Sequence, residues 1–204
     1  MKILTIPVGP LATNCHCVFL ETNRRLFVID PGDDSEAILK GVRSLPDFES
    51  AQILLTHAHV DHISAAGAVA AALPAERVIL DPADLPLYRS PENAILPFLP
   101  APADLPETTA PESSSDFTAI PLPGHSPGGT GYLFTEAGKR ALFAGDSLFA
   151  GSIGRTDLWG GDYDELLKSI REQIFTLPPD TEVFPGHGES TTVGREREEN
   201  PYLQ

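Results

Sequence analysis

The sequence feature that most constrains the fold is a dense run of metal-ligating side chains, His57-Ala58-His59-Val60-Asp61-His62. The apolar segment Gln52–Thr56 before it predicts a short strand, and the Ala-rich segment Ile63–Leu73 after it predicts a helix. Three imidazoles and one carboxylate are costly to bury unless each has a polar partner, and a metal ion is such a partner. The run therefore predicts a metal site where a strand turns into a helix.

The spacing within this run indicates two metal-binding points. Residues two apart on an extended segment face the same way, so His57 and His59 converge on one point. Asp61 and His62 lie where the chain turns into the helix, and they face a second point beside the first. Imidazole together with carboxylate suits zinc, and it also suits iron or manganese.

Three further candidate ligands follow predicted strands elsewhere in the chain. They are His125, Asp146 and His187, and the strands predicted before them are Phe117–Leu122, Arg140–Phe143 and Glu182–Phe184. A glycine precedes each of the three, which lets the backbone turn sharply there. Ligands at the C-terminal ends of strands predict one site at one edge of a sheet. Five histidines and two aspartates exceed the shell of one metal, whereas two metals that share Asp146 as a bridge accommodate them.

This ordered set of residues resembles the metallo-β-lactamase fold superfamily, over essentially the whole chain. The resemblance implies an α/β (α+β) fold, an αββα four-layer sandwich with metals at one edge of its sheets. It implies two divalent metal ions, with zinc expected and iron or manganese as alternatives. It also implies that Asp30, in Val28-Ile29-Asp30-Pro31-Gly32, supports the metal ligands without binding a metal itself. The first metal would be held by His57, His59 and His125, the second by Asp61, His62 and His187, with Asp146 as bridge.

Within the superfamily, the chain resembles glyoxalase II and its short single-domain relatives. The matching stretches are Pro123–Gly128, Gly145–Phe149 and Pro185–Gly188. The resemblance implies a hydrolase that cleaves S-2-hydroxyacylglutathione or a related thioester through a metal-bridging hydroxide, with Asp61 and Asp146 as the catalytic carboxylates. Since the chain ends at Gln204, the C-terminal helical domain of the long enzymes is expected to be missing.

The segment Gly154-Arg155-Thr156-Asp157 stands where the family has a Lys-x-Tyr contact to glutathione. We expect Arg155 to bind a carboxylate of the substrate, because its guanidinium forms two parallel hydrogen bonds with such a group. Alternatively, Arg155 pairs with Asp157 or another nearby acid. Asp157 cannot replace an aromatic hydroxyl, so metal-dependent hydrolysis is the firmer implication and glutathione specificity the weaker one.

Two other functions remain open. Persulfide dioxygenases of the same superfamily use one iron, held by the residues equivalent to His57, His59 or His125, and Asp146. The segments Gly154–Asp157 and Ile174–Pro178 resemble their sequence, whereas Gly186-His187-Gly188 departs from their usual Ala-His-Asp. A metal-binding module without enzymatic activity is the third possibility, and the complete two-metal ligand set argues against it.

Further secondary structure follows from local patterns. A hairpin is predicted where Thr22-Asn23-Arg24 joins the β-rich runs Cys17–Leu20 and Leu26–Ile29. Other predicted strands are Val78–Leu80 and Gly131–Phe134, and predicted helices are Ser35–Leu45, capped from Asp33-Asp34-Ser35, then Tyr163–Leu177 and the charged tail from Val193. The proline-rich segment 85–111 predicts a loop, either over an active site or a tolerated insertion.

Composition excludes several classes of protein. The length of 204 residues suits one domain, 1–204, and 41% hydrophobic residues exclude a disordered chain. A net charge of −15 argues against nucleic acid or an anionic membrane as the main partner, since both need a basic surface. A small-molecule substrate is expected, and the sequence does not predict an oligomeric state.

A cytoplasmic location is expected from the cysteines and from the start of the chain. Cys15 and Cys17 are too close along one strand to bridge, and two cysteines form no disulfide framework. The N-terminal Ile3–Ile6, interrupted by Pro7, lacks the apolar stretch of a secretory signal. His16 has no ligand motif around it and is expected to be structural or on the surface.

Overall fold

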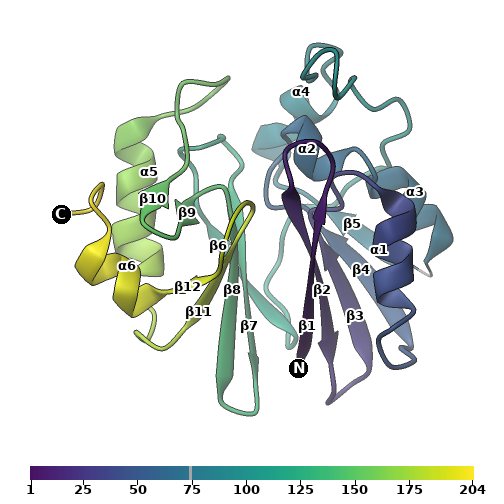
Figure 1. Ribbon diagram of the computed structural model, residues 1–204, viewed down its shortest axis with the longest axis horizontal. Coiled ribbons are helices and arrows are strands. Elements are labelled where there is room, and N and C mark those ends of the chain that lie inside the picture. The colour runs from purple at the N-terminus through teal and green to yellow at the C-terminus, as the bar shows by residue number, and fades with distance from the viewer. Residues whose placement is uncertain (74) are drawn as a thin grey trace. The chain divides into compact units, whose positions relative to one another are not determined.

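The computed structural model describes residues 1–73 and 75–204, which form two compact units, 1–110 and 111–204. Each unit contains one five-stranded sheet and its own hydrophobic core. Figure 1 shows the long helices of each unit along one face of that unit's sheet. The expectation that residues 1–204 make one domain stays a prediction.

The sheet of the first unit has the strand order β1-β2-β3-β4-β5. Its strands are β1 (Lys2–Val8), β2 (Thr13–Leu20), β3 (Arg25–Ile29), β4 (Ser50–Leu54) and β5 (Ala75–Ile79). The first three are antiparallel, and the hairpin predicted between β2 and β3 is confirmed. The strand β4 runs parallel to both β3 and β5. Pro7 does not interrupt β1, because β1 is an edge strand and tolerates a residue without an N–H.

The helix predicted at Ser35–Leu45 is α1 (Ser35–Val42), and its predicted cap is wrong. Asp34 occupies the N-cap position in a left-handed backbone conformation, with φ 46°. Its carboxylate accepts a hydrogen bond from Gly9 N at 3.0 Å instead of capping the helix. Asp34 therefore ties the β1–β2 turn to the start of this helix.

The single helix predicted at Ile63–Leu73 is also wrong, because the chain forms α2 (Val60–Ile63) and α3 (Ala66–Ala72). The break has a local cause at residues 64 and 65. Ala65 N donates to Pro31 O at 2.9 Å, so this amide leaves the helical hydrogen-bond pattern. A side chain at Gly32 would collide with the Asp61 carbonyl. The turn after β3 thus packs directly against α2.

The proline-rich segment contains only short regular elements, as predicted. The four-residue helix α4 (Leu85–Tyr88) lies within it, and the 3-10 helix η1 (Pro82–Asp84) lies just before it. The segment is nonetheless packed on its unit. Thr109 N donates to Val78 O at 2.9 Å, and a side chain at Gly67 would collide with the Asp104 carbonyl.

The sheet of the second unit has the strand order β12-β11-β8-β7-β6. Its strands are β6 (Phe117–Pro121), β7 (Thr130–Glu136), β8 (Lys139–Gly145), β11 (Glu182–Pro185) and β12 (Thr191–Thr192), with a separate hairpin of β9 (Leu148–Phe149) and β10 (Ser152–Ile153). The predicted helix 163–177 begins as α5 (Tyr163–Ser169) and continues as the π-helix η2 (Ile170–Ile174). The helical tail is α6 (Val193–Glu199).

Cysteine and histidine residues of β2 are buried in the first unit, as expected for structural residues. Cys15 and Cys17 are free thiols with no exposed surface. Burial raises the pKa of the Cys15 thiol well above its usual range, which keeps it protonated and a poor nucleophile. The His16 ring lies opposite Thr5 on β1, 3.0 Å from its hydroxyl.

In the described part of the chain, each helix is too short or too polar to cross a membrane.

The tail helix α6 holds the β9–β10 hairpin through Glu196, whose side chain is buried. Its carboxylate accepts hydrogen bonds from Thr191 Oγ1 at 2.5 Å, from Gly151 N at 2.8 Å and from Asn200 Nδ2 at 2.8 Å. Gly151 forms the turn of the hairpin, and Asn200 also donates to Ser152 O at 3.0 Å. A charged acceptor with three buried or half-buried donors is a strong local anchor.

We expect Glu196→Ala to lower the free energy of unfolding by about 2–4 kcal/mol, because three donors lose their acceptor. Urea denaturation measures this loss. Glu198→Ala, on the exposed side of the same helix, is the control and should stay within about 0.5 kcal/mol of the parent protein. Equal effects of the two substitutions would contradict the anchoring role of Glu196.

Candidate metal centre

In the first unit, candidate ligands gather at the edge where two parallel strands end. Asp30 follows β3, and Thr56 and His57 follow β4, which runs in the same direction. Parallel strands place their C-terminal ends at one sheet edge, so these residues are neighbours although 26 positions apart. The strand-end placement predicted from sequence is confirmed within this unit.

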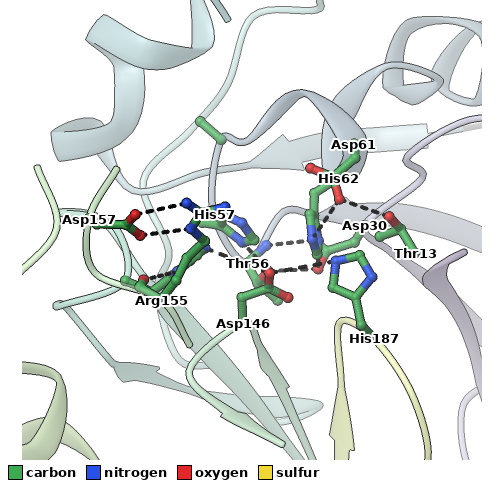
Figure 2. Close-up of polar contacts among 12 residues, drawn as sticks. Thr13, Asp30, Thr56, His57, Asp61, His62, Asp146, Arg155, Asp157 and His187 are labelled. Atoms are coloured by element: carbon green, nitrogen blue, oxygen red, sulfur yellow. Dashed lines mark hydrogen bonds and ion pairs between the residues drawn. The ribbon is translucent and has the colours of Figure 1, made fainter. Parts of the chain in front are cut away.

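Asp30 organises this edge through its buried carboxylate (Figure 2). Its Oδ1 accepts a hydrogen bond from Thr56 N at 2.7 Å, and its Oδ2 accepts one from Thr56 Oγ1 at 2.6 Å. The same Oδ2 lies 3.0 Å from His62 Nδ1. Asp30 has φ 50°, an unfavourable value for a residue with a side chain, and such strain is typical of functional positions.

These contacts determine which imidazole nitrogen faces a metal. The Nδ1 atom of His62 bonds to Asp30, and the Nδ1 atom of His57 lies 3.0 Å from Thr56 Oγ1. With Nδ1 in a hydrogen bond, Nε2 is the nitrogen through which either ring would bind a metal. The centroid of the His57 ring is 4.1 Å from that of His62 and 4.7 Å from that of His59. The cluster of imidazoles predicted from residues 57–62 is thus present.

Asp61 adds a carboxylate on the other side of His62. Its Oδ2 accepts a hydrogen bond from Thr13 Oγ1 at 2.9 Å and lies 3.5 Å from His62 Nε2. No sequence pattern identified Thr13, because it is 48 positions from Asp61 and reaches it only where β2 contacts α2 in the folded chain. Asp61 is therefore oriented from the strand next to the one that carries Asp30.

In the second unit, three candidate ligands follow strands that end at one edge. The strand β11 is parallel to β8, and β6 runs in the same direction because both β6 and β8 are antiparallel to β7. His187 and Asp146 are brought together by a hydrogen bond from Gly186 N to Gly145 O at 2.8 Å. The predicted grouping of His125, Asp146 and His187 is thus confirmed within this unit.

Asp146 lies between the two histidines of its unit. Its Oδ2 is 3.7 Å from His125 Nε2 and 3.6 Å from His187 Nε2. These separations are too long for hydrogen bonds. They are close to the distance of about 3.4 Å between two ligand atoms of a tetrahedral zinc site with bonds of about 2.0–2.1 Å. The same comparison holds for Asp61 and His62 at 3.5 Å, so the donor atoms fit divalent metals.

The loop after the β9–β10 hairpin orients His125. Its Nδ1 lies 2.7 Å from the carbonyl oxygen of Arg155, which again assigns Nε2 as the ligand nitrogen. Gly154 makes this approach possible, because a side chain there would collide with the Asp146 carbonyl. The hairpin thus begins beside one candidate ligand, Asp146, and ends at the carbonyl that orients another, His125.

The Arg155 guanidinium forms a bidentate ion pair with Asp157, which Figure 2 shows. The distances are 2.7 Å from Nε to Oδ1 and 2.8 Å from Nη2 to Oδ2. The hydrogen bonds from Arg155 lower the pKa of the Asp157 carboxyl to about 2, so the pair is intact at neutral pH. Both side chains are exposed, and an exposed pair of this kind is weak enough for a competing carboxylate to replace.

Comparison with known proteins identifies the family. The sequence model of the metallo-beta-lactamase superfamily matches residues 11–187. The hydroxyacylglutathione hydrolase GloC of Haemophilus influenzae is 35% identical and is aligned over 100% of this chain and 98% of its own. Solved structures of similar proteins agree with this assignment.

Three of these structures bear on the site. The BLEG-1 B3 metallo-beta-lactamase has a TM-score of 0.85 and 34% identity, covering 99% of both chains. TTHA1623, solved in a di-iron-bound form, has a TM-score of 0.82 and 37% identity, covering 98% of this chain and 100% of its own. ETHE1 from Myxococcus xanthus has a TM-score of 0.74 and 26% identity, covering 98% of this chain and 84% of its own. The chain therefore belongs to the metallo-β-lactamase superfamily of metallo-hydrolases and has the fold of that superfamily.

Proposed function

We propose that this chain is a metal-dependent thioester hydrolase of the glyoxalase II type, which cleaves S-2-hydroxyacylglutathione or a related thioester. The observation that carries the proposal is the geometry of Asp146, whose one carboxylate oxygen lies within 3.7 Å of ligand nitrogens on two histidines. The similarity to GloC along the full chain supports the thioester as substrate class.

The proposed ligand set is the one expected from the sequence. His57, His59 and His125 would hold the first metal, Asp61, His62 and His187 would hold the second, and Asp146 would be shared by both. Zinc is the metal we propose, and the di-iron form of TTHA1623 makes iron the first alternative. Histidine and carboxylate ligands suit both metals.

Two divalent ions in such a site supply a nucleophile from water at neutral pH and stabilise the negative charge that develops on the carbonyl oxygen. The protein keeps the ligands in place for this chemistry. Asp30 and the Arg155 carbonyl hold His62 and His125 in the tautomer that presents Nε2. The leaving thiol is acidic enough to depart without a strong general acid. Cys15 and Cys17 are buried and take no part.

Arg155 is the proposed contact for a substrate carboxylate. A cation beside the site offsets the repulsion between an anionic substrate and a chain of net charge −15. The Asp157 carboxylate already accepts two hydrogen bonds from the same guanidinium. A carboxylate-bearing substrate must therefore displace the Asp157 carboxylate from Arg155. This competition makes the substrate bind more weakly than it would without Asp157.

A persulfide dioxygenase with one iron is the second candidate, favoured by the similarity to ETHE1 at 26% identity. The two activities differ in products. Hydrolysis of S-lactoylglutathione releases free thiol without oxygen, whereas the dioxygenase consumes oxygen with glutathione persulfide. Both assays, run on one preparation together with a β-lactam as a third substrate, decide among these activities. Oxygen uptake without thioester hydrolysis would overturn our proposal.

We expect two equivalents of metal per chain after reconstitution with zinc, because seven ligand residues exceed the shell of one ion. Elemental analysis of the dialysed protein measures the stoichiometry. A value that stays at one equivalent under excess metal would contradict the dinuclear site and favour the dioxygenase.

Asp146→Ala should lower kcat/KM for thioester hydrolysis by at least about 100-fold, since removal of a shared ligand disorders both metals. His59→Ala should cause a loss of similar size. Cys17→Ala is the control and should retain activity, because Cys17 is part of the hydrophobic core of its unit and is not a proposed ligand. Metal content is measured on every variant. An Asp146→Ala protein with normal turnover would refute the assignment of Asp146 as bridge.

Substitutions at the ion pair test substrate recognition. Arg155→Ala should lower kcat/KM for a carboxylate-bearing thioester by about 3- to 10-fold, as expected for an exposed charged contact. Asp157→Asn should raise the same quantity, because it releases the guanidinium to the substrate. A small neutral thioester is the matched control and should respond to neither substitution. Equal losses on both substrates would indicate that Arg155 is only structural.

A further inference from the structure

We propose that Asp84 and Asn93 are positioning residues that hold the Ala58 peptide, and through it His57 and His59, in the geometry that binds metal. This inference rests on the proposed function, because it assumes that these two histidines are ligands. It assigns a role to two residues that carry no metal-binding motif.

Two buried hydrogen bonds hold the backbone of Ala58. Ala58 N donates to Asp84 Oδ2 at 2.9 Å. Asn93 Nδ2 donates to Ala58 O at 2.8 Å. Ala58 and Asp84 have no exposed surface, and Asn93 is 5% exposed. Water therefore does not compete for these bonds, and loss of either partner leaves a buried backbone group without its acceptor or donor.

The position of Ala58 explains why side chains are needed there. The strand β4 ends at Leu54 and the helix α2 begins at Val60, so Ala58 lies between the two regular elements. Neither the sheet nor the helix supplies a partner for its N–H and C=O groups. Buried backbone groups need partners, and Asp84 and Asn93 provide them from another part of the unit.

The two hydrogen bonds fix the backbone on both sides of Ala58. The amide of Ala58 belongs to the peptide plane that begins at the Cα of His57, and its carbonyl belongs to the plane that ends at the Cα of His59. Since each peptide is planar, fixing both groups fixes the positions of the His57 and His59 Cα atoms relative to each other, and with them the points from which the two side chains start. Asp84 and Asn93 act through these histidines, and they are therefore positioning residues rather than catalytic ones.

Both residues are themselves held firmly. Asp84 ends the 3-10 helix η1, which Asp81 caps by accepting a hydrogen bond from Ala83 N at 2.9 Å. Asn93 lies in the proline-rich segment, where Asn93 N donates to Ser90 O at 3.2 Å. The Tyr88 hydroxyl donates to Pro106 O at 3.0 Å and closes the two ends of the same segment. The proline-rich segment is thus a brace for the ligand loop and not a tolerated insertion.

The test measures metal affinity directly. Zinc affinity of Asp84→Ala and Asn93→Ala is determined by competition with a chromophoric chelator, and the d–d absorption of the cobalt-substituted proteins reports ligand geometry. We expect about 10- to 100-fold weaker zinc binding in both variants, the usual effect of removing a group that orients a ligand. Asp84→Asn should recover part of the affinity, because an amide oxygen accepts the same hydrogen bond.

Tyr88→Phe is the matched control. It removes a hydrogen bond from the same proline-rich segment without touching Ala58. Its thermal stability without metal should fall, whereas its zinc affinity and cobalt spectrum should match those of the parent protein. Should Asp84→Ala fail to fold, Asn93→Ala decides the question, since it leaves the charged acceptor of Ala58 N in place.

The outcomes separate this inference from the proposed function. Zinc affinity in Asp84→Ala and Asn93→Ala within twofold of the parent value, with stability lost as in Tyr88→Phe, would overturn the inference alone. A parent protein that binds no zinc, iron or manganese would overturn the proposed function and this inference with it. Weaker binding and an altered cobalt spectrum in the two variants, but not in Tyr88→Phe, supports the positioning role.

Discussion

The hydrogen bonds of the Asp30 carboxylate are the interaction on which the first unit depends. One buried side chain joins the end of β3 to the end of β4 through Thr56 and sets the tautomer of His62. A buried carboxylate without such partners would cost several kcal/mol, so the partners and the carboxylate stabilise one another. The strained backbone of Asp30 is tolerated because three donors converge on its side chain.

In the second unit, a backbone carbonyl rather than a carboxylate orients a candidate histidine ligand. The Arg155 carbonyl orients His125 as Asp30 orients His62, and Gly154 allows the close approach. The β9–β10 hairpin that precedes Arg155 is anchored by Glu196 of α6. A carbonyl oxygen can only accept a hydrogen bond, so it favours the proton on Nδ1 of His125 and leaves Nε2 facing away from it. Each unit therefore presents rings whose orientation is set before any metal arrives.

Much of the candidate site was predictable because its residues follow strands and lie close together in sequence. The runs around His57 and His125 are local patterns, and strand direction alone brings Asp146 to His187. The supporting contacts were not predictable. Thr13 reaches Asp61 and Asp84 reaches Ala58 only through tertiary packing, and neither residue stands in a motif. The break between α2 and α3 escaped prediction for the same reason, because Pro31 takes the amide of Ala65.

The proline-rich segment shows how a loop without regular structure contributes to a metal site. Prolines restrict the backbone before folding, so less conformational entropy is lost when Asn93 is placed at the Ala58 carbonyl. A flexible segment of equal length would weaken the same hydrogen bond by that entropy. A helix through Ala58 would turn His57 and His59 to opposite sides, so the ligand loop lies between β4 and α2 and outside both. Its rigidity must therefore come from other parts of the chain. Asn93 of the proline-rich segment supplies the donor for the Ala58 carbonyl, and Asp84, just before that segment, supplies the acceptor for the Ala58 amide.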